Sequence, residues 1–387
     1  MDSKILARLA ILASGFLSRP ARPRTAGPDH ILLCICNRFE PLHRATKSLA
    51  MRRLDEWDRR LPSVRDGFAD SDGSGPRHTF FHPAEHCDVD ILTRLAAICA
   101  SGRAETELCL LDTPSEPGAL RDKINEALGR LTGHGLLAAD GKGRPAYGLM
   151  REGRTVNGGR GRADLEAGVL AETGCYADFS GPDALRRFRP RSPNSIFYAC
   201  AGDGRRMERR LARVGPNVTD ALDPPPPRPP LRAGGRDGGL LVVQGPLALD
   251  WRARGGPRLM PRIEDGEISG ARPPDANRLR LWLKSAVHVI GRPEWLFVKL
   301  LARGCDEAGD STEMLLGRPM RTFLRDVQAF CAGAGARLHY VSARELANIV
   351  HAAEDGLAGN PGEYRDYIYR PHGRGARDRN RTAPSPA

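Results

Sequence analysis

The 387-residue sequence predicts an α/β fold: a barrel-like α/β domain interrupted by a proline-rich insertion. Short apolar runs alternate with amphipathic helical patterns along most of the chain. Such alternation implies parallel strands joined by helical crossovers. The series of strands is too long for a small open sheet, so we expect a barrel, in which the strands form the inner wall and the helices surround it.

The elements follow in order along the chain. Apolar runs of strand length predict strands at His30–Cys36, His78–His82, Glu107–Leu111, Tyr147–Met150, Cys175–Phe179, Ser195–Ala199, Leu240–Gln244, Leu296–Leu300 and Arg337–Val341. Helical periodicity predicts helices at Arg44–Arg60, Val89–Ser101, Gly118–Leu131, Ala163–Thr173, Asp275–Val287, Glu313–Cys331 and Ala343–Asp355. Ser342 directly precedes the last helix and is predicted to cap it.

Three segments flank or interrupt the predicted domain at 30–368. Residues 1–29 read as an amphipathic helix with a basic linker, 204–236 as a Pro/Arg-rich insertion, and 369–387 as a disordered basic tail. These three segments together carry the whole net charge of +12, so the rest of the chain is neutral overall. Because only 6% of residues are aromatic and none interleave with the arginine runs, the pattern argues against nucleic acid. The proline-rich insertion is instead a candidate docking segment for a protein partner.

The sequence excludes an integral membrane protein, because no apolar run approaches the roughly 18 residues needed to span a bilayer. For Lys4–Arg19, a helix packed on the domain is favoured over a membrane-surface anchor. The nine cysteines form no Cys-x-x-Cys pair, which predicts free thiols and a reducing compartment. We therefore expect a cytoplasmic protein, with peripheral membrane attachment as the alternative.

In a barrel of this kind, the chemistry lies where the strands end. Several predicted strands end in polar or reactive residues, at Asn37–Pro41, His82–Asp88, Cys109–Asp112, Gln244–Pro246 and Lys299–Arg303. Among these residues Glu40 is a candidate pocket acid, as is Asp178 at the end of another strand. Lys299 could bind an anionic sugar group.

Several strings in and around these strand ends resemble one family. They are Arg38-Phe39-Glu40-Pro41, Phe81-His82-Pro83-Ala84-Glu85, Glu172-Thr173-Gly174-Cys175-Tyr176-Ala177-Asp178-Phe179 and Asn194-Ser195-Ile196-Phe197-Tyr198, with Gly291-Arg292-Pro293-Glu294-Trp295 and Phe297-Val298-Lys299-Leu300 further on. The likeness is to a bacterial group related to the NodB-type polysaccharide deacetylases, and it covers about residues 28–368. It implies a distorted (β/α) barrel that removes acyl groups from sugars with a divalent metal held by Asp and His.

This chain departs from that family at four places where the likeness implies metal ligands. The residues found there are Asn37-Arg38, Cys109-Leu110-Leu111, Arg151-Glu152-Gly153, and Leu301 with Arg303. An arginine beside a metal repels it and stays protonated. We therefore expect a degenerate metal site and no bound cofactor. The favoured hypothesis is a non-catalytic carbohydrate-binding or scaffolding protein, with Asn37, Arg38, Lys299 and Arg303 lining a cleft for an acidic sugar.

The alternative hypothesis is an active metal-dependent deacetylase. His82 and His86 have a spacing that places two imidazoles on one helical face, with Glu85 and Asp88 nearby. These four residues would then hold zinc, manganese or nickel. A third hypothesis, an arginine-rich nucleic-acid binder, would depend on residues 204–236 and 370–387.

Overall fold

The computed structural model describes residues 28–151, 162–181, 194–200, 208–214, 239–254, 261–305 and 309–371. The predicted helix at Lys4–Arg19, most of the proline-rich insertion and nearly all of the basic tail lie outside these residues. No helix in the described part of the chain combines the length and the apolarity needed to cross a membrane.

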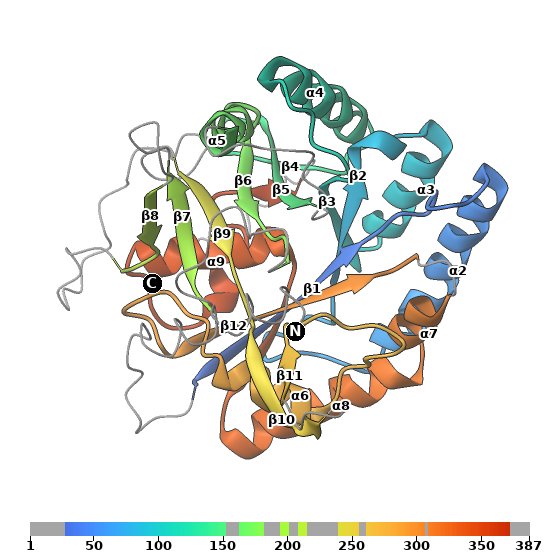
Figure 1. Cartoon of the computed structure of the whole chain (residues 1–387). Coiled ribbons are helices and arrows are strands. Elements are labelled where there is room, and N and C mark those ends of the chain that lie inside the picture. Colours follow the sequence, from blue (N-terminus) through green and yellow to red (C-terminus); the bar gives the residue numbers. More distant parts are fainter. Residues whose placement is uncertain are drawn as a thin grey trace, which may run out of the picture.

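One twelve-stranded sheet forms the scaffold, with a separate two-stranded sheet beside it (Figure 1). The main path runs through β12 (Trp295–Arg303), β1 (His30–Arg38), β2 (His78–Pro83), β3 (Ala104–Leu110), β5 (Pro145–Arg151), β6 (Cys175–Asp178) and β9 (Leu240–Val243). These strands are parallel to their neighbours. The path ends in two antiparallel strands, β7 (Ile196–Cys200) and β8 (Glu208–Leu211).

The remaining strands are peripheral to this path. β13 (Arg337–Val341) pairs with the first half of β1, and the short strands β4 (Ala138–Ala139) and β14 (Arg370–Pro371) pair with each other. The separate sheet is a hairpin of β10 (Ala248–Arg254) and β11 (Pro261–Glu264).

The sheet has two differently covered faces, because successive side chains of a strand point to opposite sides. On β1, Ile31, Leu33 and Ile35 pack in the larger core cluster, and alternate residues pack in the other one. The first face, which we call the outer face, is covered by α2 (Lys47–Arg65), α3 (Val89–Ala100), α4 (Pro117–Gly133), α6 (Ala276–Lys284) and α8 (Arg318–Ala334). Figure 1 shows α2, α3 and α4 on this side, while α9 (Ala343–Glu354) lies against the inner face.

Every residue of α9 is buried, including its charged ones. Because a buried charge is costly unless paired, each needs a partner on the surrounding elements. Arg344 donates to Glu105 on β3, and Glu345 forms an ion pair with Arg77 at 2.6 Å. The N-cap predicted at Ser342 is confirmed, because its side chain accepts from the Glu345 amide. The Glu345 side chain accepts in turn from the Ser342 amide, which completes a capping box.

The sheet curls strongly along its path. β12 and β9 stand at the two ends of the parallel run. Nevertheless, Lys299 on β12 donates from Nζ to the Val243 carbonyl oxygen on β9, at 2.6 Å. The inner face is therefore concave, and the predicted α/β class with a large, mostly parallel sheet is confirmed.

Each predicted strand overlaps an observed one, but the predicted helix Glu313–Cys331 is wrong. It is two helices, α7 (Asp310–Leu316) and α8, separated at the extended residue Gly317. A Cβ atom on Gly317 would lie 2.4 Å from the Glu313 carbonyl oxygen. Helix α5 (Arg162–Glu172), by contrast, matches its prediction closely.

The predicted free thiols are also found in the described part of the chain. The eight cysteines whose side chains the structure describes form no disulfide bond with one another, and seven of them are buried. Cys34 and Cys36 lie on the inner face of β1, where they pack as small apolar groups.

Candidate functional site

Two arginines end adjacent parallel strands at the carboxyl edge of the sheet. Arg38 on β1 and Arg303 on β12 occupy paired positions in the register. Residues paired in this way project from the same face of a sheet. Because Cys36 and Leu301, two positions earlier, pack on the inner face, both arginines lie at the rim of that face. Arg303 is exposed.

Glu40 lies just beyond this rim and is buried. Its carboxylate forms an ion pair with Nε of Arg38 and lies 3.2 Å from Nδ1 of His43. A turn produces the second contact, because the His43 amide donates to the Glu40 carbonyl oxygen at 2.9 Å. The His43 side chain is 38% exposed. A carboxylate that orients a partly exposed imidazole is suited to proton transfer.

His43 is a functional candidate that sequence reasoning missed. Its signal was available, because a histidine three residues after an acid in a turn can reach back to that acid. The turn itself was missed, because the sequence predicted that a helix begins at Arg44. The helix instead begins at Lys47, after Thr46 accepts from the Leu49 amide.

Lys299 is buried on the inner face and is fully occupied by the protein. Its ammonium donates to three backbone carbonyl oxygens, of Val243 at 2.6 Å, Phe179 at 2.9 Å and Ser180 at 3.1 Å. Burial lowers the pKa of Lys299, but three acceptors match the three donors of the protonated form. Lys299 is therefore not available to a sugar ligand, in contrast to the sequence prediction.

Asn37 also lies away from the predicted cleft. It alternates with the inner-face residues of β1 and is fully buried on the outer face. Close packing holds it there, because a Cβ atom on Gly304 would lie 2.4 Å from Asn37 Nδ2. Among the described residues, neither polar atom of the Asn37 side chain has a hydrogen-bond partner. The prediction that Asn37 lines the cleft with Arg38 is therefore not supported.

Asp178 belongs to a buried ion-pair cluster. Arg151 on β5 forms ion pairs with both Asp178 and Glu166. The second Asp178 oxygen accepts from the Ser180 amide at 2.8 Å. Arg151 thus neutralises the Asp178 carboxylate. This arginine begins the string Arg151-Glu152-Gly153, where the family likeness implies metal ligands. This arrangement stabilises the ends of β5 and β6. Because both oxygens of Asp178 are engaged in it, Asp178 is not available as a catalytic acid.

The alternative metal ligands are dispersed. His82 is the penultimate residue of β2, and its Nε2 lies 3.1 Å from the His86 carbonyl oxygen. The following Ala84–His86 segment is a single 3₁₀ turn, so the expected helical face is not formed. Glu85 pairs with Lys123 at 2.6 Å, and Asp88 caps α3. Burial lowers the pKa of His82 to about 4, which keeps it neutral.

A different group of potential metal ligands lies at the opposite edge of the sheet, the amino edge. Asp70, Asp72 and His339 each offer an atom within 4.8 Å of the others. No local pattern predicts this group, because 267 positions separate Asp72 from His339. Arg365 already occupies it, with Nη2 at 2.8 Å from Asp70 and 3.1 Å from Asp72. With Arg365 in this position, the group is an ion-pair network. It could hold a metal ion only if the Arg365 side chain moved away.

A surface groove of about 490 Å³ lies at this same amino edge, between α4 and the starts of β5 and β6. Its lining includes Asn125, Arg144 and Glu172. The groove lies at the edge of the sheet opposite to the one that carries Arg38 and Arg303. Its lining residues bring together no acid–base pair like that of Glu40 and His43.

Comparison with known proteins adds no family assignment. No protein-family model matches the chain, and no curated protein sequence matches it either. The candidate site therefore rests on its geometry: an exposed arginine and an ion-paired arginine side by side at the carboxyl edge, next to a buried acid and a half-exposed histidine.

Proposed function

We propose that this protein binds an acidic carbohydrate at the carboxyl edge of its sheet, through Arg38 and Arg303, without metal-dependent catalysis. The observation that carries the proposal is the paired register of these two arginines. Their Cα positions are neighbours on adjacent strands, so both guanidinium groups can approach one carboxylate or two successive ones. Guanidinium groups bind carboxylates in a planar, bidentate way.

Arg303 supplies the free cation in this pair. It is exposed, and no ion pair of Arg303 occurs among the described residues. Arg38 is held at its position by Glu40, which fixes the direction of its side chain. The edge therefore combines one positioned arginine with one that retains its full charge for a ligand. His43 adds a hydrogen-bonding group of the type that contacts sugar hydroxyls.

The charges at this edge oppose a divalent cation. Lys299 brings an ammonium group to the inner face just below the rim, bound to carbonyl oxygens from β9 and the end of β6. Carbonyl oxygens are also ligands for hard cations, so the ammonium takes acceptors that a metal could use. Arg38 and Arg303 add further positive charge above it. The likeness to the deacetylases implies a metal site at this edge. These positive charges support the proposal that the site has been lost.

We further propose that the curled sheet is a distorted barrel of the polysaccharide-deacetylase type. The contact from Lys299 to Val243 supports this, because it joins the two ends of the parallel run. A parallel bridge between Glu267 and Leu301 adds a segment along the free side of β12. The family assignment itself depends on the sequence likeness.

Calorimetric titration with two oligosaccharides of equal length tests the binding proposal. We expect binding of a β-linked glucuronic acid hexamer and no binding of a neutral glucose hexamer. Arg303→Ala should weaken binding by about tenfold or more, since a charge-assisted hydrogen bond contributes about 1.5–3 kcal/mol. Arg59→Ala, which removes an exposed arginine of α2, is the matched control. Equal affinity of the wild type and Arg303→Ala, or no binding by either, would refute the proposal.

A further inference from the structure

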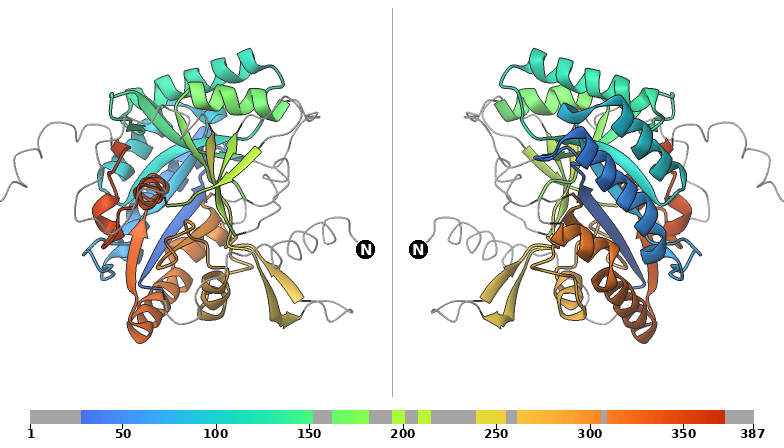
Figure 2. Two further views of the ribbon diagram at one scale, coloured as in Figure 1. Left: turned by 90° about the vertical axis from the view of Figure 1, so that its left-hand side faces the viewer. Right: turned by 90° about the vertical axis from the view of Figure 1, so that its right-hand side faces the viewer.

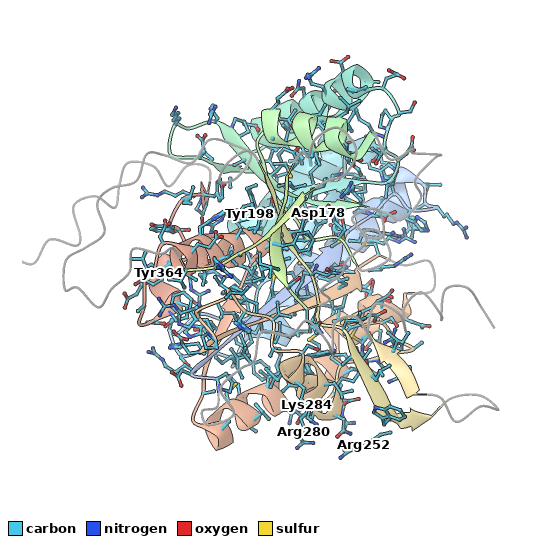
Figure 3. All side chains as sticks on the ribbon, turned by 60° about the vertical axis from the view of Figure 1, so that its left-hand side comes forward. Asp178, Tyr198, Arg252, Arg280, Lys284 and Tyr364 are labelled. Carbon is cyan, nitrogen blue, oxygen red and sulfur yellow. The ribbon has the colours of Figure 1, made fainter. Side chains whose placement is uncertain are left out.

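A second cluster of cations lies on α6 and the β10–β11 hairpin, away from the carboxyl-edge site. We call this the hairpin surface and define it by Trp251, Arg252, Arg280 and Lys284. All four side chains are exposed, and Trp251 has 62% of its surface accessible. Figure 3 shows Arg252, Arg280 and Lys284 close together at one end of the molecule.

Two of these cations converge on one neutral group. Arg252 donates from Nη1 to Asn277 Oδ1 at 3.2 Å, and Arg280 donates from its own Nη1 to the same oxygen at 3.3 Å. Because the Asn277 side chain is uncharged, these two hydrogen bonds do not neutralise the positive charge of either guanidinium group. Neither of them forms an ion pair with any described residue. Lys284 follows Arg280 by four positions on α6 and extends the positive charge along the same helix face.

The acids closest to these cations in the sequence are already engaged elsewhere. Asp250 pairs with Arg262 at 3.4 Å and accepts from the Arg252 amide. Asp275 caps α6 by accepting from the Asn277 and Arg278 amides. The guanidinium groups of Arg252 and Arg280 therefore present positive charge to whatever lies outside the protein.

The tryptophan distinguishes this surface from an ordinary solvated patch. Large exposed apolar side chains are few on the described part of the molecule, and Trp251 is the aromatic one among them. It lies on a hairpin that forms its own small sheet, and Figure 2 shows this hairpin projecting from the body of the molecule. Tryptophan prefers the boundary between lipid tails and headgroups, where lysine and arginine are drawn to anionic lipids.

From this arrangement we infer that the hairpin surface docks onto an anionic lipid bilayer. Since successive side chains of β10 point to opposite sides of the hairpin, the hairpin docks edge-on: Trp251 inserts at the headgroup level on one side, and Arg252, Arg280 and Lys284 contact the lipid phosphates and carboxylates on the other. The carboxyl-edge site uses other residues, so this inference stands independently of the carbohydrate proposal.

Co-sedimentation with vesicles tests the inference on the full chain. We expect binding to vesicles of 70% phosphatidylcholine and 30% phosphatidylserine, and little binding to phosphatidylcholine alone. One cation near such a surface is worth about fivefold in affinity, so Arg252→Gln/Arg280→Gln should weaken binding about twenty-five-fold. Trp251→Ala should weaken it about tenfold, through the loss of buried apolar area.

Matched controls come from exposed residues elsewhere. Arg52→Gln/Arg59→Gln removes two arginines of α2, and Leu165→Ala removes an apolar side chain of α5 that is 56% exposed. Both controls should bind as the wild type does. The inference is overturned if the wild type does not sediment, if it binds neutral vesicles equally well, or if the hairpin variants bind like the controls.

Discussion

Glu107 is a buried acid whose contacts are hydrogen bonds to neutral groups. It lies on β3 and accepts from the Tyr176 hydroxyl and from the Gly148 amide. Burial raises the pKa of Glu107 from 4.5 to about 8, and these two hydrogen bonds only partly oppose that effect. Glu107 is therefore protonated in the folded protein at neutral pH, whereas it is ionised in the unfolded chain.

This difference makes stability depend on pH in a defined direction. The contribution of Glu107 is fully present below pH 4.5 and is lost as pH rises towards about 8. Between these limits the free energy of unfolding should fall by up to about 1.4 kcal/mol per pH unit from this residue. Glu107→Gln keeps the shape and removes the charge, so it should abolish that part of the slope.

Urea unfolding at pH 6 and pH 8 measures the effect. The variant should gain stability relative to the wild type at pH 8, and the gap should narrow at pH 6. Glu126→Gln on α4 changes an exposed acid and serves as the control. An unchanged pH slope in Glu107→Gln would show that the carboxyl group is ionised in the folded state.

The sequence alone could not have identified this residue. Glu105 and Glu107 alternate with Ala104, Thr106 and Leu108 in β3, and two charges on one side of a strand are typical of a solvated face. The inner face is instead covered by α9, whose Arg344 pairs with Glu105 across 239 positions. Glu40, by contrast, could be predicted, because its partners Arg38 and His43 lie within three residues of it.

At the level of secondary structure, the break between α7 and α8 has a steric cause. Gly317 has extended backbone angles, and the two helices meet there. A Cβ atom would lie 2.4 Å from the Glu313 carbonyl oxygen and 2.6 Å from its side-chain oxygen. Pro319, at the start of α8, also lacks an amide donor to continue the preceding helix.

Gly317→Ala should therefore destabilise the protein by about 1–3 kcal/mol, the usual cost of overpacking. Chemical denaturation measures this change. Gly333→Ala is the matched control, because Gly333 lies in α8 and a Cβ atom added there would meet no other atom within 4 Å. The control should be neutral or stabilising by up to about 1 kcal/mol, from the helix propensity of alanine. Equal effects of the two substitutions would show that the α7–α8 junction can relax.

Secondary structure was predictable where the signals that determine it lie within the segment itself. Helices α3 and α9 match their predicted ranges within one residue, because periodicity and N-caps lie within the segments themselves. The antiparallel pairing of β7 with β9 and β8 was not predicted, and neither was the β10–β11 hairpin. Strand direction depends on the connections, and the sequence predicted one parallel series throughout.

For the whole molecule, the distribution of charge predicts its metal content. Elemental mass spectrometry of the purified protein should find no stoichiometric zinc, manganese or nickel, since Lys299, Arg38 and Arg303 oppose a cation at the carboxyl edge. The His82→Ala/His86→Ala double variant should give the same result.

Two outcomes would contradict this expectation in different ways. A metal that disappears in the His82→Ala/His86→Ala variant would restore the active deacetylase hypothesis. A metal that disappears instead in Asp72→Ala would place it at the amino edge, beside His339 and Arg365. Either finding would be confirmed by the metal content after dialysis against a chelator.

The overall α/β class was predictable because strand–helix alternation extends along most of the chain. The site was predictable only in part. Sequence order correctly placed Arg38 and Arg303 at strand ends, but it could not show that Lys299 turns inward to three carbonyl oxygens or that Asn37 lies on the outer face. The direction of the Lys299 side chain depends on the curl of the sheet. The face on which Asn37 lies depends on which alternate residues of β1 point inward.

The position of β1 has a consequence for how the protein is made. β1 is the first described strand, yet two of its neighbours, β12 and β13, are encoded about 265 and 307 residues later. Ribosomes add about 5–20 residues per second, so β1 must wait for tens of seconds before these partners exist. During that interval its apolar run at Ile31–Cys36 lacks these two partners. Such a run is the kind of segment to which a chaperone that shields nascent chains binds.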